Sequence, residues 1–172
     1  MCIRDRIRDF EVTIAENGSA QISGRIEFNE VAQDRIRHAN SAYTQEEMDK
    51  YIKSILDLNG VQINNYTIDI NEKLPIVTLN IEMEIRKFAN VSGNRIFVPI
   101  LNLAHRGMDL PNSKDRMHPV EIKNQTQYID NIKINLPENF TVESSPKPTS
   151  KIDDDFFDFT VEVVQNLSLI HI

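Results

Sequence analysis

Residues 77–85 read VTLNIEMEI, so that every odd position is apolar and every even position is polar. Successive side chains of a β-strand point to opposite faces, and this alternation therefore predicts a strand with one face on a core and the other in water. Residues 20–28 read AQISGRIEF and repeat the pattern, with apolar or small side chains at the even positions. Alternation of this kind is typical of antiparallel sheets.

The same period of two recurs along the chain. Residues 132–136 and 157–163 also alternate apolar with polar side chains and predict two further strands. Shorter candidate strands are the segments 10–15, 61–70, 95–101, 120–122 and 140–143. In the second of these, the apolar parity switches between Ile63 and Tyr66, which predicts a β-bulge. Residues 16–19, ENGS, predict a hairpin turn because Asn-Gly tolerates the positive φ that such a turn requires.

One amphipathic helix is predicted at about residues 44–58. Thr44 and Glu47 have the spacing of a capping box, which satisfies free backbone N–H groups at a helix start. Tyr43 and Met48 stand where a hydrophobic staple would be. An apolar face follows at helical spacing, formed by Met48, Tyr51, Ile52, Ile55, Leu56 and Leu58. Asn59-Gly60 then supplies a stop signal.

These elements together predict a mostly β fold, an antiparallel β-sandwich with one inserted helix. Many short strands separated by turn signals favour this class. Two stretches, 105–119 and 144–155, contain the proline and turn residues of loops. The length suits one domain with a sizeable core.

The two ends of the chain resemble a short DNA element used in preparing sequencing libraries. Residues 1–6, MCIRDR, can be read from ATGTGTATAAGAGACAG followed by one further base. The reverse complement, CTGTCTCTTATACACAT, encodes LSLIH and then the start of an isoleucine codon, which matches residues 167–172, LSLIHI. We therefore expect residues 1–6 and 167–172 to be artefacts, and residues 7–166 to be one domain truncated on both sides.

Composition excludes several classes of protein. The whole chain carries 19 basic and 26 acidic residues, for a net charge of −7. Without Arg4, Arg6 and Asp5, these counts become 17 and 25, for a net charge of −8. Such a chain has no general attraction to nucleic acid or anionic lipid. The one cysteine, Cys2, lies in the suspected artefact, so residues 7–166 have no thiol for a disulfide, a nucleophile or a metal site. No apolar run approaches the roughly 20 residues of a membrane span.

Two groups of residues could bind a metal ion, but each fits a plainer interpretation. Residues 153–155 are three aspartates that could bind Ca²⁺, yet no glycine or distal acid follows at the spacing of a calcium loop, and a solvated acidic loop fits better. His105 and His118 flank one predicted loop, but zinc prefers three or four ligands. The sequence predicts no metal ligand and no cofactor.

Other motifs also favour structural interpretations. Serine, histidine and aspartate occur without a Gly-x-Ser-x-Gly elbow, and no glycine-rich phosphate loop is present, so no catalytic residue is predicted. Arg86, Lys87 and Arg95 are interleaved with acidic residues, which disfavours a nucleic-acid stripe. The phenylalanines Phe156, Phe157 and Phe159 could stack on a sugar, but at strand spacing they fit a core. Five Asn-x-Ser/Thr triplets, starting at Asn17, Asn65, Asn90, Asn124 and Asn139, fit a chain rich in asparagine.

Three segments resemble a known family. Residues 93–99 read GNRIFVP, residues 116–120 read RMHPV and residues 136–146 read LPENFTVESSP. They resemble the C-terminal domain of unknown function that follows a transglutaminase-like core in certain Gram-negative envelope proteins. The resemblance extends over roughly residues 10–164, and Ser145 departs from it where the family usually has leucine.

The resemblance implies an accessory role in a bacterial envelope or periplasmic protein. The transglutaminase-like core carries a Cys-His-Asp triad with cysteine as the nucleophile. None of that triad can be assigned here, because residues 7–166 have no cysteine and the three histidines match no motif of the core. The implied partner is therefore the upstream transglutaminase-like core of the same parent chain, and this part of it is expected not to be an enzyme.

Two alternatives remain open. The first is an independent carbohydrate- or protein-binding module. An exposed row of aromatic side chains that includes Tyr66 or Tyr128 would support it. The second is a hydrolytic enzyme, which requires a nucleophile and a base in hydrogen-bond reach. Truncation would also leave an unpaired strand edge near residues 157–163, and such edges promote aggregation. The ligand and the oligomeric state are not predicted.

Overall fold

The computed structural model describes residues 3–71, 76–104, 126–153 and 157–164. The chain divides into two compact units, residues 1–137 and residues 138–172. The first contains a five-stranded sheet and two α-helices, and the second contains a two-stranded sheet. Within the described segments, no helix has both the length and the apolar character needed to cross a bilayer.

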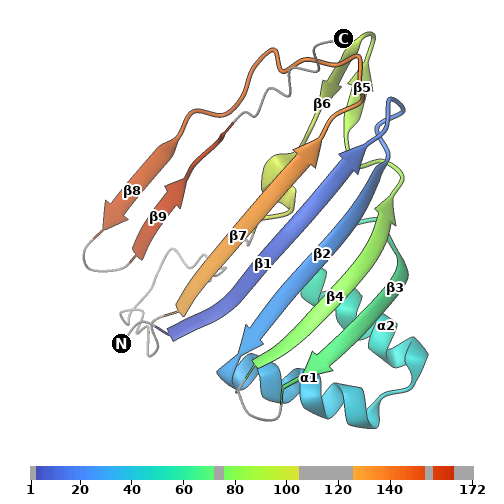
Figure 1. The fold of residues 1–172 in the computed structure, drawn as a ribbon, viewed down its shortest axis with the longest axis vertical. Coiled ribbons are helices and arrows are strands. Elements are labelled where there is room, and N and C mark those ends of the chain that lie inside the picture. The colour runs from blue at the N-terminus through green and yellow to red at the C-terminus, as the bar shows by residue number, and fades with distance from the viewer. Residues whose placement is uncertain (1–2, 72–75, 105–125, 154–156, 165–172) are drawn as a thin grey trace, which may run out of the picture. The chain divides into compact units, whose positions relative to one another are not determined.

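The five-stranded sheet dominates the first unit (Figure 1). Its strands are β1 (Ile3–Ile14), β2 (Ala20–Asn29), β3 (Val61–Ile70), β4 (Ile76–Ile85) and β7 (Thr126–Asn135). Their order in space is β3-β4-β2-β1-β7. Neighbouring strands are antiparallel except for β1 and β7, which run parallel. The sheet is therefore mixed, whereas the alternation had predicted an antiparallel one.

The alternation of residues 77–85 is confirmed. One face of β4 is buried, at Val77, Leu79, Ile81, Met83 and Ile85. The small and apolar positions of β2 lie on the same face, because Ile81 pairs with Gly24 across the two strands. Each fully buried aliphatic side chain contributes roughly 1.5–3 kcal/mol through loss of contact with water. This shared face decides the strand register, because a slip by one residue would turn the apolar set into water.

Two helices, α1 (Glu30–Ala42) and α2 (Gln45–Leu56), lie on one side of this sheet (Figure 1). Ile36 of α1 and Ile52 of α2 are almost completely buried and belong to the same core cluster as the strand residues. The opposite face of the sheet carries mainly polar side chains, such as Glu11 and Lys133. The core therefore lies between the sheet and the helices.

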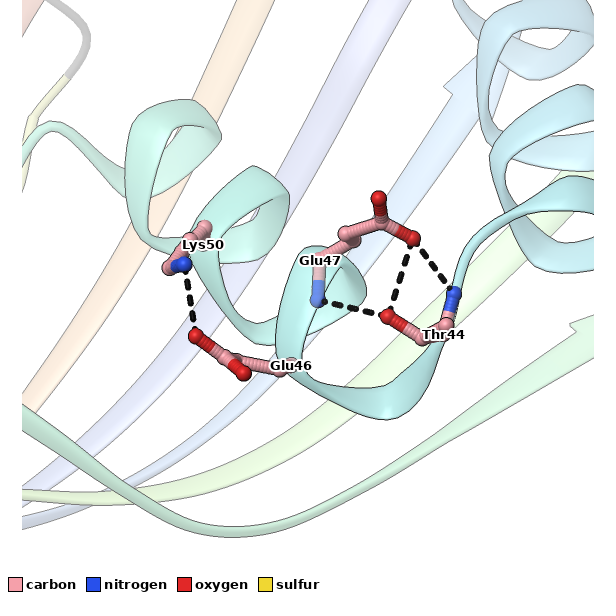
Figure 2. A network of polar contacts seen from close by, with 4 residues as sticks. All are labelled: Thr44, Glu46, Glu47 and Lys50. Atoms are coloured by element: carbon pink, nitrogen blue, oxygen red, sulfur yellow. Dashed lines mark hydrogen bonds and ion pairs between the residues drawn. The ribbon is translucent and has the colours of Figure 1, made fainter.

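The predicted helix at 44–58 is confirmed as α2, with a different end. Thr44 accepts a hydrogen bond from the Glu47 backbone N–H, and the Glu47 carboxylate accepts from the Thr44 backbone N–H over 2.8 Å (Figure 2). The helix stops at a left-handed cap on Asp57, with φ +50°, before the predicted Asn59-Gly60 signal. Tyr43 lies edge-on against the Tyr51 ring at 5.7 Å.

The prediction of a single helix was incomplete, because α1 was missed. Among the residues of α1 whose side chains the structure describes, the apolar ones in the core cluster or packed against it are Ala32, Ile36 and Ala39, two of them alanines. A stripe so narrow gives little helical periodicity. Contacts of α1 with β2 and β4 stabilise a segment whose own pattern is weak.

The predicted turn and bulge are both confirmed. Gly18 has φ +81°, and its carbonyl accepts hydrogen bonds from Phe88 N–H at 3.1 Å and Ala89 N–H at 2.9 Å. A Cβ at Gly18 would lie 2.4 Å from the Ala89 oxygen, so glycine is required there. The β3–β4 register shifts between Ile63 and Asn65, the region where the apolar parity changes.

Residues 95–101 form a shorter strand than predicted. The structure has β5 (Asn90–Ser92) and β6 (Arg95–Phe97) as a hairpin, and a 3₁₀ turn, η1 (Ile100–Asn102), follows. Pro99 lacks a backbone N–H and cannot continue the ladder, which explains the early end of β6. The predicted strand at 120–122 and the predicted loop at 105–119 lie outside the described residues.

The second unit contains β8 (Thr149–Asp153) paired antiparallel with β9 (Phe157–Val161). The strand predicted at 157–163 is present as β9 but ends at Val161. The loop predicted at 144–155 contains β8, and the strand predicted at 140–143 is irregular. In the described part of this unit β9 pairs with β8 alone, which leaves one edge of each strand unpaired.

The mostly β class is confirmed, and the arrangement is consistent with a β-sandwich-like fold. Two details differ from the prediction: two helices are present where one was expected, and one strand pair of the main sheet is parallel.

Candidate functional site

The predicted metal candidates lie mostly outside the part of the chain that the structure describes. His105, His118, Asp154 and Asp155 are all outside it, and Asp153 is the last residue of β8. Within the described segments, no group of three or more His, Cys, Asp or Glu side chains could hold a metal ion.

His38 is the histidine that the structure describes, and it is exposed on α1. The Ser41 hydroxyl lies one helical turn away and donates to the His38 backbone carbonyl over 2.9 Å. This is a local side chain–backbone bond of the kind that serine makes in helices. The hydroxyl is thus engaged with the backbone and is not directed at the imidazole.

Tyr66 and Tyr128 do not form a row. Tyr66 lies on β3 and Tyr128 on β7, the two opposite edges of the five-stranded sheet, with three strands between them. The Tyr66 hydroxyl accepts a hydrogen bond from the Gln45 side-chain amide at 2.8 Å, while Tyr128 is 41% exposed. Phe156 lies outside the described residues, as do the side chains of Phe157 and Phe159.

An open hollow of about 600 Å³ lies beside the β5–β6 hairpin. It is lined by Lys87, Phe88, Ala89, Asn90, Phe97, Val98 and Pro99. Phe97 is 56% exposed, so an exposed aromatic residue and a lysine line the same hollow. Of the basic residues noted in the sequence, Lys87 lies here, and Arg86 and Arg95 are exposed on the turn after β4 and on β6.

The polar face of the sheet is organised by cross-strand pairs between β1 and β7. The Asn131 amide donates to Asp9 at 2.7 Å, and the Lys133 ammonium donates to Glu11 at 2.7 Å. Asn135 donates to the same Glu11 carboxylate at 2.9 Å. Hydrogen bonds from Lys133 and Asn135, together with the Lys133 charge, hold the pKa of Glu11 below its ordinary value. These exposed pairs align β1 with β7.

The sequence reasoning missed a polar cluster on the opposite face, where the core lies. Arg8 occupies a core-facing position of β1, in the same parity as Phe10, and is only 5% exposed. It lies opposite Asp130 in the parallel register, and Arg8 Nε donates to Asp130 Oδ1 over 2.5 Å. Arg6 is the next residue of β1 on that face and pairs with Tyr128.

Both arginines lie over aromatic rings. The Arg6 guanidinium is 5.0 Å from the centre of the Phe28 ring, and the Arg8 guanidinium is 5.9 Å from that of Phe10. Such cation–π contacts hold a guanidinium at a defined position. We refer to Arg6, Arg8 and Asp130 as the arginine cluster.

The arginine cluster has two guanidinium groups but only one carboxylate group. Burial, followed by the charge of Arg8, lowers the pKa of Arg6, while Tyr128, Asp130 and Tyr51 act in the opposite direction. Arg6 Nε and Arg8 Nη2 are buried and make no hydrogen bond in the described structure. Buried donors are normally paired, so these two are exceptions. The signal in the sequence was a pair of arginines at the apolar parity of β1.

A comparison with protein families gives one match. Residues 94–172 match a family described as a Domain of Unknown Function with solved-structure structure (DUF3858). No curated protein and no solved structure matches the chain. The matched region begins just before β6 and includes β7, β8 and β9, and it contains most of the segment 93–146 that carries the family resemblance in the sequence. This part of the chain is therefore similar to a domain of unknown function.

Proposed function

We propose that this chain is a non-catalytic accessory domain of a bacterial transglutaminase-like envelope protein. Its partner is the catalytic core encoded upstream in the same parent chain, and its place is the periplasm or the cell envelope. The observation that supports the proposal is that residues 94–172 match a domain of unknown function, a region that contains most of the segment 93–146 whose sequence resembles the domain that follows such cores.

The chemistry of the chain agrees with a supporting role. A transglutaminase-like core needs a cysteine nucleophile, and residues 7–166 contain none, so the chemistry must come from another part of the parent protein. The described core is built from apolar side chains of the sheet and the two helices, as a scaffold requires. An accessory domain of this kind can position a core or its substrate without touching the reacting atoms.

The first test is to read the parent gene outward from both ends of this coding region. A continuous frame leading upstream into a core with a Cys-His-Asp triad supports the proposal. A stop codon and an independent start directly upstream, without such a core, overturn it.

The second test is physical. The catalytic core and this domain are expressed as separate polypeptides, and their association is measured by calorimetry. The matched control is a core variant in which the catalytic cysteine is replaced by alanine and the surface is unchanged. Association that is equal for both cores supports a role in positioning that is independent of catalysis. Lack of association, with full activity of the core alone, contradicts it.

The hollow beside the β5–β6 hairpin favours a second candidate, a carbohydrate- or protein-binding module. Exposed Phe97 could stack on a ligand, and Lys87 could bind an acidic group at the same hollow. Binding of glycan fragments that is lost in Phe97→Ala but retained in Tyr43→Ala would favour this function. Tyr43 is the control because it is also an exposed aromatic residue but does not line the hollow.

A further inference from the structure

We propose that Asn59 is a site of spontaneous covalent modification, at which the side-chain amide is converted to a carboxylate with the Gly60 backbone nitrogen as the internal nucleophile. The chain has two Asn-Gly pairs, Asn17-Gly18 and Asn59-Gly60. The fold holds the two pairs differently, and this difference protects Asn17 and leaves Asn59 reactive. Nothing in the proposed accessory role requires the reaction, so the inference goes beyond that role.

The reaction is a ring closure within one Asn-Gly pair. The Gly60 backbone nitrogen gives up its proton to a solvent base and attacks Cγ of Asn59. A bond between these two atoms forms, the bond from Cγ to the side-chain nitrogen breaks, and that nitrogen leaves as ammonia with a proton from the solvent. Water then opens the cyclic imide at either of its carbonyl groups, which gives aspartate or isoaspartate. Amide and water thus become acid and ammonia, without any oxidation or reduction.

Two features make an Asn-Gly pair suited to this reaction. The attacking nitrogen belongs to the neighbouring residue, so the nucleophile is already close to its target. Glycine has no Cβ to obstruct the approach and adopts the backbone conformations that ring closure needs. The hydrogen bonds and the packing around each pair therefore decide whether the ring can close in the folded protein.

The Asn17-Gly18 pair is held in the turn between β1 and β2 by hydrogen bonds on both residues. The Gly18 N–H, which carries the nitrogen that would attack, donates to the Ala15 carbonyl over 2.9 Å. Asn17 Oδ1 accepts from the Ser19 backbone N–H at 3.0 Å and from the Ser19 hydroxyl at 2.8 Å. Gly18 is also buried, and its carbonyl accepts from the Ala89 N–H at 2.9 Å. Ring closure at Asn17 therefore requires the turn to open first.

The Asn59-Gly60 pair lies in the connection between α2 and β3 and lacks these restraints. Both residues are exposed, and a Cβ added at Gly60 would meet no atom within 4 Å. Gly60 has φ +72°, close to the +81° of Gly18, so the two pairs differ in their contacts rather than in the glycine conformation. Among the described residues, neither the Asn59 side chain nor the Gly60 N–H has a hydrogen-bond partner. The two reacting groups can therefore meet without any opening of the fold.

Conversion of Asn59 changes both the charge and the length of this connection. A carboxylate at position 59 adds a negative charge two residues after Asp57, the C-cap of α2, where the helix dipole disfavours negative charge. Isoaspartate also routes the main chain through the side chain and lengthens it by one methylene group just before Val61. Val61 pairs with Ile85 at the start of β3 and packs against the core. The modification therefore acts on the attachment of the edge strand β3.

The experiment incubates the full chain of 172 residues in mildly alkaline buffer below its unfolding temperature and, in parallel, in guanidinium chloride. Peptide mass spectrometry follows the conversion of amide to acid at each asparagine, and electron-transfer fragmentation distinguishes isoaspartate from aspartate. In the folded chain, we expect Asn59 to react at least about tenfold faster than Asn17, because only Asn17 has to wait for local opening. In denaturant the two rates should converge, because neither pair is then held by the fold.

Two variants assign the fast reaction to its site. Asn59→Gln should abolish it, because glutamine would have to close a larger ring. Asn17→Gln is the matched control and should leave the reaction at Asn59 unchanged. Both side chains are exposed, so neither substitution removes a buried contact.

Three outcomes overturn the proposal. The first is a rate at Asn17 equal to or above the rate at Asn59 in the folded chain. The second is a ratio of the two rates that is the same in denaturant, because the fold would then play no part. The third is conversion of Asn59 to aspartate without isoaspartate, which excludes ring closure with the Gly60 nitrogen.

Discussion

Arg8 and Asp130 lie directly opposite each other across the parallel pair β1–β7, and their side chains form an ion pair that is mostly buried, with 6% of the Arg8 and 15% of the Asp130 side chain exposed. The two residues are 122 positions apart in the sequence. This pair connects the edge strand of the sheet to β1 on the same face as the apolar core.

The first prediction concerns this ion pair. Asp130→Ala should lower the free energy of unfolding by about 2–4 kcal/mol, because it leaves the buried Arg8 without its carboxylate. Urea unfolding at neutral pH measures the change. The matched control is Glu27→Ala, which breaks the exposed pair with Arg25 and should cost no more than about 1 kcal/mol. Equal costs for the two variants would contradict the assignment of Asp130 as a buried partner.

A second prediction concerns Gly24 on β2, which pairs with Phe10 of β1. A Cβ added at Gly24 would lie 2.6 Å from the Phe10 ring and 3.1 Å from Ile81 Cγ2. Gly24→Ala should therefore cost about 1–3 kcal/mol through overpacking. Adding Phe10→Leu should recover part of that loss if the ring is the cause. If the free-energy costs of Gly24→Ala and Phe10→Leu simply add in the double variant, a clash between these two residues is excluded.

The third prediction concerns the start of α2. Thr44→Ala should destabilise the protein by about 1 kcal/mol, because the Glu47 backbone N–H loses its acceptor (Figure 2). Ser41→Ala, near the end of α1, removes a hydroxyl bonded to a helix carbonyl and serves as the control, with an expected effect within about 0.5 kcal/mol. Thermal unfolding of both variants is the measurement.

The same cap predicts a dependence on pH. Hydrogen bonds from the Thr44 backbone and hydroxyl lower the pKa of Glu47 below its ordinary 4.5. The folded pKa is below the unfolded one, so the stabilisation is present above the unfolded pKa and is lost as the pH falls through the folded pKa. The NMR titration midpoint of Glu47 should therefore lie below 4.5 and move up in Thr44→Ala. An unchanged midpoint would show that the capping bonds do not act on the carboxylate.

A fifth prediction concerns the polar face. Lys133 and Asn135 both donate to Glu11 and hold its pKa below the ordinary value. Lys133→Met should raise the Glu11 titration midpoint toward 4.5, because it removes the largest of these hydrogen bonds and a positive charge. The control is Lys87→Met, which changes a lysine beside the β5–β6 hairpin and should leave the Glu11 titration midpoint unchanged. Equal shifts of the Glu11 titration midpoint in Lys133→Met and in Lys87→Met would indicate a general effect of net charge instead.

The local elements of this protein were determined by its sequence alone. The alternation of residues 77–85, the Asn17-Gly18 turn and the Thr44–Glu47 capping box each depend on residues close together in the chain, so their physical cause is visible in the sequence. The polar and apolar faces of β2 and β4 follow from the same alternation.

The tertiary structure decided the features that depend on distant partners. The parallel pairing of β1 with β7 and the Arg8–Asp130 ion pair both join residues 122 positions apart. Helix α1 depends on the sheet beneath it, because its own apolar stripe is too narrow to predict it. The arginine cluster belongs to the same class: a charged residue at an apolar parity is visible in the sequence, but only the fold shows which carboxylate it meets and which donors stay unused.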